Sequence, residues 1–130
     1  MTEYVADTHA LYWYLTAAPQ LGANALAAFR EAEQGKARIY LPSIVLAELY
    51  YLNAKAGRPL DFATEYARLS NASQFVFVDF RAEDILRFDA LSTIPETHDR
   101  IIAGVAVARQ CACLTRDSLI VASRLVSVVW

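Results

Sequence analysis

Four acidic side chains, spread over the whole chain, have the residue types and positions that could support catalysis. They are Asp7, Glu48, Asp99 and Asp117. Asp7 follows a short apolar segment, and Asp117 follows the apolar run 111–115. Asp99 lies in the first turn of a predicted helix that precedes this apolar run and is expected to pack antiparallel to it. The carboxylates of Asp99 and Asp117 are therefore expected at one edge of a parallel sheet, where α/β folds bind their ligands.

Glu48 belongs to a helical pattern that begins at Pro42-Ser43. Its neighbours at three and four residues are all apolar, namely Ile44, Val45, Tyr51 and Leu52. A carboxylate surrounded by such side chains costs several kcal/mol unless it is paired or binds a metal. The alternative is a glutamate that faces solvent on an interface helix.

Acids gathered at one edge would favour a bound cation. Two carboxylates about 5 Å apart repel by roughly 3 kcal/mol at an effective dielectric constant of about 20. Several such pairs would exceed the net stability of a typical domain, about 5–15 kcal/mol, so the acids must take up protons or bind a cation. Oxygen ligands suit Mg²⁺ or Mn²⁺, which activate water for phosphodiester hydrolysis. Taken singly, Asp7 and Asp117 are also good helix N-caps and Asp99 a good first-turn residue.

The acids can meet only if the chain alternates strands and helices. Apolar segments predict strands at 3–6, 38–41, 75–78, 111–115 and 126–130. Helical spacing and stop signals predict helices at 10–15, 21–34, 43–55, 61–71, 82–91 and from Thr97, the expected N-cap, to about 110. This order predicts a single α/β domain, residues 1–130, with a doubly wound, mostly parallel sheet flanked by helices.

Composition restricts the partners. The chain has 130 residues, 56% of them hydrophobic, and a mean hydropathy of +0.26, but no apolar run long enough for a membrane span and no signal-peptide pattern. The excess apolar surface predicts a protein interface. A net charge of −2 gives no general nucleic-acid signal, so a nuclease would need a local basic rim. Cys111 and Cys113 fit neither a disulfide framework nor a zinc site and predict a cytoplasmic protein.

Several short motifs occur in a specific order and spacing over nearly the whole chain. They are Ala6-Asp7-Thr8-His9-Ala10-Leu11, Pro42-Ser43 with Glu48, the segment 94–100, Leu114-Thr115-Arg116-Asp117 and Val128-Val129-Trp130. Together they resemble a PIN-domain ribonuclease of the VapC toxin type, found in prokaryotic toxin–antitoxin pairs. The resemblance implies a Mg²⁺- or Mn²⁺-dependent endoribonuclease that leaves a 5′-phosphate and a 3′-hydroxyl. It also implies a homodimer and inhibition by a cognate antitoxin.

The resemblance also implies roles for individual residues. Asp7, Asp99 and Asp117 would hold the cation, and Glu48 would hold a second cation or orient the attacking water. Thr115 would be a hydroxyl accessory of this catalytic and metal-binding set.

The residues beside the acids are weaker candidates. Glu96 stands where relatives often carry Asp, which makes it a second-rank metal candidate, although a solvated loop glutamate is the simpler interpretation. His9 and His98 are interpreted as structural, with His98 at most lining the cleft. Arg100 and Arg116 each follow an acid and could hold RNA phosphate or buttress a carboxylate, and for Arg100 the salt bridge is favoured.

Aromatic and basic side chains outside these motifs suggest surfaces. The aromatic run 12–14 could stack on bases but is expected to pack internally. Residues 50–52 predict a subunit or antitoxin interface, and Lys55 and Arg58 could belong to a basic rim.

Three other functions compete with a nuclease. A receiver-like signalling domain would need an acidic pair after the first strand and a lysine after the fifth, but Asp7 has no acidic neighbour and no lysine follows Lys55. An Asp-x-Asp phosphatase is disfavoured because position 9 is His. A PIN fold that only binds RNA or protein is the other alternative.

Overall fold

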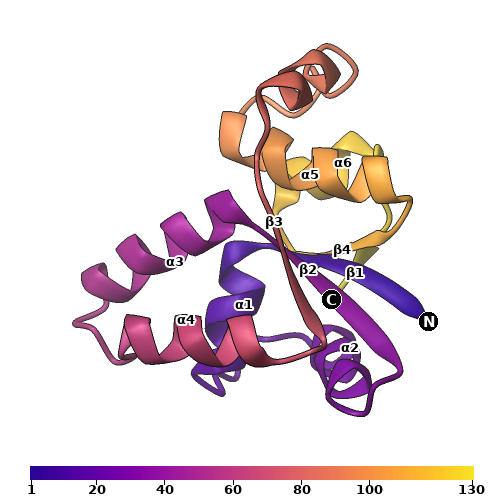
Figure 1. Cartoon of the computed structure of the whole chain (residues 1–130). Coiled ribbons are helices and arrows are strands. Elements are labelled where there is room, and N and C mark those ends of the chain that lie inside the picture. The colour runs from indigo at the N-terminus through magenta and orange to yellow at the C-terminus, as the bar shows by residue number, and fades with distance from the viewer.

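A five-stranded sheet forms the centre of the molecule (Figure 1). The computed structural model describes residues 1–130. Its strands are β1 (Thr2–Ala6), β2 (Ala37–Pro42), β3 (Phe75–Val78), β4 (Ala112–Leu114) and β5 (Val128–Val129), in the spatial order β3-β2-β1-β4-β5. Every neighbouring pair is parallel, so the predicted α/β fold is confirmed, with a sheet that is parallel throughout. All carboxyl ends of the strands consequently meet at one edge.

Helices cover both faces of the sheet. They are α1 (Thr8–Leu15), α2 (Ala23–Glu33), α3 (Ser43–Lys55), α4 (Phe62–Asn71), the 3₁₀ helix η1 (Ala82–Arg87), α5 (Thr97–Arg109) and α6 (Ser118–Ser123). In Figure 1, α5 and α6 lie above the sheet, and α1, α2 and α4 lie below it. None of these helices combines the length and the apolar character that a membrane crossing requires.

The core lies on the middle strands and is built from the residues that the apolar segments contribute. Strand β2 is buried at five of its six positions, as expected for a parallel strand covered on both faces. Phe29 of α2 is fully buried, and its ring stacks on that of Tyr14 at 4.1 Å between centroids. Tyr12 also packs against this core, so two of the three aromatic residues at 12–14 pack internally, as predicted.

The segment 82–91, predicted as one helix, is different in the structure. It forms the short 3₁₀ helix η1 followed by turns, and none of the residues of η1 is buried. Short helices are marginal in water without an apolar face packed on the rest of the fold. Ile85 and Leu86 are instead exposed, at 51% and 82% of their surface.

The start of α5 also differs from expectation. The N-cap of α5 is Glu96 and not Thr97, because the Glu96 carboxylate accepts a hydrogen bond from the Asp99 amide at 2.8 Å. Thr97 is the first helical residue. At α4 the N-cap is Asp61, whose carboxylate accepts from the Thr64 amide at 3.0 Å.

Helix α3, which carries Glu48, is closed at its C-terminal end by Asn53. The side chain is 4% exposed, donates to the Leu60 carbonyl at 2.8 Å and accepts from the Leu60 amide at 3.0 Å. Asn53→Ala is expected to lower the free energy of unfolding by about 2 kcal/mol, because both backbone groups lose their partner. Urea unfolding would measure this loss. The exposed Asn71→Ala should change the value by less than about 0.5 kcal/mol, and equal effects of the two substitutions would contradict this role for Asn53.

Candidate active site

The register of β1 and β4 places Asp7 beside Thr115. Ala6 is paired with Leu114, and the Asp7 amide donates to the Leu114 carbonyl at 3.1 Å. Asp7 is 9% exposed and caps α1, where its carboxylate accepts from the Ala10 amide at 2.8 Å. The buried Thr115 hydroxyl is hydrogen-bonded to the Asp7 carboxyl and also accepts from the Asp117 amide at 3.0 Å. Two adjacent parallel strands thus bring these residues to one edge.

Asp117 and Asp99 reach the same edge from two helices. Asp117 caps α6, and one of its carboxylate oxygens accepts from the Leu119 and Ile120 amides at 2.9 and 3.0 Å. Asp99 is half-buried in the first turn of α5. The predicted convergence of the start of this helix with the end of β4 is therefore observed.

Glu48 arrives from α3 and is held by two other elements. Its carboxylate accepts from the Thr8 hydroxyl at 2.6 Å and contacts His98 Nδ1 at 3.1 Å. The side chain is 33% exposed, between the two interpretations that the sequence left open, a buried and paired carboxylate and a solvent-facing glutamate. Tyr51 and Leu52 line the same pocket as Glu48 and do not enclose it.

All four acids line one open pocket of about 710 Å³. The remaining lining residues are Thr8, His9, Trp13, Tyr51, Leu52, Lys55, His98, Ile102, Arg116 and Trp130. Because the pocket lies at the carboxyl edge of a parallel sheet, it has the usual location of a ligand site in this fold class.

The gathered charges alter proton affinity within this pocket. Burial, followed by the carboxylates of Asp117, Glu96, Glu48 and Asp7, raises the pKa of Asp99 from 3.8 to about 6. Burial also raises the pKa of Asp7, opposed by its hydrogen bonds to Thr115 and Ala10. The four acids therefore interact electrostatically, and a nearby cation would relieve this repulsion.

This shift predicts a pH dependence of stability when no metal is bound. Between pH 3.8 and about 6 the folded state binds more protons at Asp99 than the unfolded state does, so stability falls as pH rises. The contribution is fully present below pH 3.8 and is lost above about pH 6. Allowing for solvent screening of a half-buried group, we expect a loss of about 1–2 kcal/mol. Urea unfolding in EDTA at several pH values would measure the loss, which should be absent in Asp99→Asn.

The donor set fits a hard divalent cation in its chemistry. In the structure no three His, Cys, Asp or Glu side chains are already arranged around a common point. The carboxylates of Asp7 and Asp117 contact backbone amides, and Glu48 contacts Thr8 and His98. Mg²⁺ usually takes only one or two protein carboxylates and keeps several waters. A cation would favour the charged form of Asp99, whose pKa is raised by burial and by the neighbouring carboxylates.

The structure also places four of the weaker candidates beside the acids, and two of them, Arg100 and Glu96, differ from expectation. His98 lines the pocket, the cleft position that the sequence allowed for it, and contacts Glu48. His9 packs against Trp13 with ring centroids 5.1 Å apart. Arg100 makes no salt bridge with a carboxylate: its guanidinium donates to the carbonyls of Ser92 and Ile94. Glu96 is not a free loop residue but the cap of α5.

Sequence reasoning also missed two residues of the pocket. The Thr8 hydroxyl orients Glu48, and the indole of Trp130 forms part of the wall. Both occur in motifs quoted for the resemblance, but only the fold shows what they contact.

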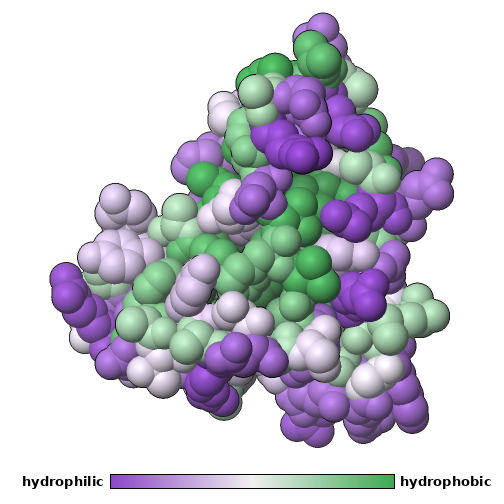
Figure 2. All heavy atoms as spheres, viewed as in Figure 1, coloured by the Kyte–Doolittle hydropathy of each residue, from purple (hydrophilic) through white to green (hydrophobic).

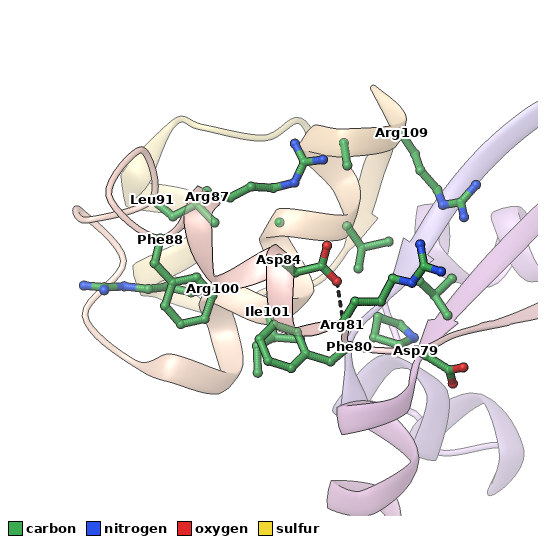
Figure 3. A pocket seen from close by; sticks show the side chains of 15 residues that line it. Asp79, Phe80, Arg81, Asp84, Arg87, Phe88, Leu91, Arg100, Ile101 and Arg109 are labelled. Carbon is green, nitrogen blue, oxygen red and sulfur yellow. Dashed lines mark hydrogen bonds between the residues drawn. The ribbon is translucent and has the colours of Figure 1, made fainter.

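A second hollow of about 310 Å³ lies between η1 and α5 (Figure 3). Its walls combine apolar side chains such as Phe80 and Ile101 with four arginines, Arg81, Arg87, Arg100 and Arg109. Figure 2, which has the same view as Figure 1, shows hydrophobic surface near the centre of the molecule. Strand β3 is an edge strand of the sheet. This hollow contains none of the four acids, so it is separate from the candidate active site.

Comparison with known proteins agrees with this architecture. The family model of the PIN domain matches residues 4–122. No curated protein sequence gives a significant match. The chain is similar in structure to VapBC2 from Rickettsia felis bound to a DNA fragment from their promoter (TM-score 0.69, 20% identity, covering 98% of this chain and 97% of the other).

Two further solved structures have the same fold. PAE2754 from Pyrobaculum aerophilum gives a TM-score of 0.66 at 18% identity, covering 98% of this chain and 83% of the other. FitAcB from Neisseria gonorrhoeae gives a TM-score of 0.56 at 20% identity, covering 96% and 95%.

Proposed function

We propose, since this chain belongs to the PIN-domain family, that it is a metal-dependent endoribonuclease and the toxin of a toxin–antitoxin pair. The observation that carries this proposal is the pocket lined by Asp7, Glu48, Asp99 and Asp117, in which burial, and then the neighbouring carboxylates, raise the pKa of Asp99 to about 6. Such a pocket favours a divalent cation, and phosphodiester hydrolysis is the reaction that this combination serves best.

The four acids would have two kinds of role in the reaction. Asp7, Asp99 and Asp117 would hold Mg²⁺ or Mn²⁺, which when bound supplies an activated water and neutralises charge on a phosphate oxygen. Glu48 lies across the pocket, where it could orient the attacking water or hold a second cation. The Thr8 hydroxyl and His98 fix its carboxylate, and Thr115 fixes that of Asp7.

The proposed partners are a cognate antitoxin and a second copy of this chain. Exposed apolar residues support such contacts, among them Tyr51 of α3 at 72% and Leu86 of η1 at 82% exposure. The similar structure from R. felis is of VapBC2 with a DNA fragment from their promoter. The arginine-lined hollow between η1 and α5 would suit an acidic segment of such a partner.

The experiment is a cleavage assay with the purified chain, free of partner. Structured RNAs are incubated with Mn²⁺ or with EDTA, and the products are separated by size. The proposal requires cleavage in Mn²⁺ only, with new 5′-phosphate ends. Intact RNA in both arms, from protein that is folded by circular dichroism, would overturn it.

A PIN domain that only binds RNA or protein is the second candidate. It is favoured by the contacts that already occupy the carboxylates of Asp7, Glu48 and Asp117. RNA binding without cleavage in the same assay would support it. A receiver-like signalling domain has no such support, because the PIN-domain match spans residues 4–122.

A further inference from the structure

Arg116 brings a positive charge to the wall of the acidic pocket without pairing to its carboxylates. It lines the pocket beside Asp117 and is exposed. The ion pairs of the chain involve other cations, and none includes Arg116. An arginine next to four acids would ordinarily form a salt bridge with one of them. Its charge is therefore left for an anion that comes from outside.

Two indole rings hold this guanidinium in place. Arg116 Cζ lies 4.5 Å from the centroid of the Trp13 ring and 5.7 Å from that of Trp130. The two indoles meet edge to face, with centroids 5.8 Å apart. A planar guanidinium stacks on aromatic faces while its N–H groups stay free at the edge. We call Trp13, Trp130 and Arg116 the Trp–Arg clamp.

The fold specifies the position of Trp130 through Gly22. A Cβ atom at Gly22 would lie 2.5 Å from both the carbonyl carbon and Cδ1 of Trp130. The backbone angle φ of Gly22 is −63°, which any residue can adopt, so glycine is needed here for the close approach and not for its flexibility. Trp130 therefore packs closely against the start of α2, and its side chain lines the pocket.

We propose that the Trp–Arg clamp binds a backbone phosphate of the RNA adjacent to the scissile one, and so positions the strand over the carboxylates. The inference rests on the proposed function, because it takes RNA to be the substrate. A polyanion that enters a pocket of four acids needs a fixed cation at its entrance. A guanidinium binds phosphate oxygens in pairs, and such contacts position a nucleic acid without reading its sequence.

The test is the affinity of the full chain for short single-stranded RNAs of different sequences, measured in EDTA so that no cleavage is expected. The chain has two tryptophans, both in the clamp, so tryptophan emission reports binding directly. Arg116→Gln should raise the dissociation constant about tenfold for every RNA. The slope of log affinity against log salt should become shallower by about 0.7, as expected for one lost phosphate contact.

Two substitutions at arginine positions complete this comparison. Arg30→Gln, on the exposed side of α2, should change neither the affinity nor the slope. Arg116→Lys keeps the charge and should restore most of the slope. The proposal is overturned if Arg116→Gln binds RNA as Arg30→Gln does.

The seat of Trp130 is tested separately. Gly22→Ala must displace Trp130 and should both shift tryptophan emission and weaken RNA binding severalfold with Arg116 intact. Trp130→Leu removes the ring without a collision and serves if Gly22→Ala does not fold. If folded Trp130→Leu protein keeps full RNA affinity, the indole does not position Arg116 and the clamp is wrong.

Failure of the clamp and failure of the nuclease are distinguishable. If Asp99→Asn abolishes cleavage while Arg116→Gln binds RNA normally, the clamp is wrong and the nuclease stands. If Arg116→Gln weakens binding while the wild-type protein leaves RNA intact in Mn²⁺, the clamp stands and the chain is a binding module.

Discussion

Asp99→Asn is expected to lower the rate of Mn²⁺-dependent RNA cleavage by roughly a thousandfold or more. Burial, followed by the charges of four other carboxylates, raises the pKa of Asp99 to about 6, so a nearby cation would be favoured there. Asparagine has nearly the same shape but lacks the charge that would hold a cation. The measurement is a single-turnover cleavage rate in saturating Mn²⁺, together with circular dichroism of the variant.

A matched substitution controls for the general effect of losing a carboxylate. Asp89→Asn changes an exposed turn residue that does not line the pocket and should cleave RNA at the wild-type rate. Near-normal cleavage by folded Asp99→Asn would remove Asp99 from the metal site. Loss of cleavage in both variants would point to a global effect on the protein.

The sequence predicted the order of elements well because apolar strands and helix stop signals are local features. Strand β3 was predicted at its observed residues, and helix α3 was predicted from Ser43 to Lys55. The segment 82–91 was predicted wrongly because its apolar residues look like a helical face in the sequence. Only Leu91 of them packs in a core cluster, whereas Ile85 and Leu86 are exposed. Helical spacing alone does not show whether a packing partner exists.

The candidate site could be predicted only as a set of residues, not as a set of contacts. The convergence of Asp99 and Asp117 follows from the antiparallel packing of a helix against the strand it precedes, which is a topological rule. The contacts of Glu48 with Thr8 and His98 span 40 and 50 positions along the chain. No local pattern encodes such contacts, so the isolated sequence left the burial of Glu48 open and identified no partner for His98.

Two of the acids, Asp7 and Asp117, serve both as helix caps and as members of the candidate metal site. Asp7 and Asp117 each cap a helix, which stabilises the fold, while their carboxylates also repel Asp99. A cap needs one carboxylate oxygen, and the observed caps of both residues use Oδ1. The other oxygen of Asp117 could therefore face a cation without loss of the helix start, whereas the Asp7 carboxyl is also hydrogen-bonded to Thr115.

Mn²⁺ is accordingly expected to stabilise the wild-type protein strongly. At about a hundred times its dissociation constant, a ligand that binds only the folded state adds about 2.7 kcal/mol to the free energy of unfolding. This corresponds to a rise in melting temperature of about 10 °C for a domain of this size.

The Asp99→Asn variant should differ from the wild type both without metal and in Mn²⁺. Without metal at pH 7 it should be more stable than wild type by about 1–2 kcal/mol after allowance for screening, and Mn²⁺ should add little. Differential scanning calorimetry in EDTA and in Mn²⁺ would measure both effects, with Asp89→Asn expected to follow the wild type. Equal melting temperatures of the wild-type protein in the two conditions would mean that the acids do not bind this cation. Their repulsion would then be relieved by protons alone.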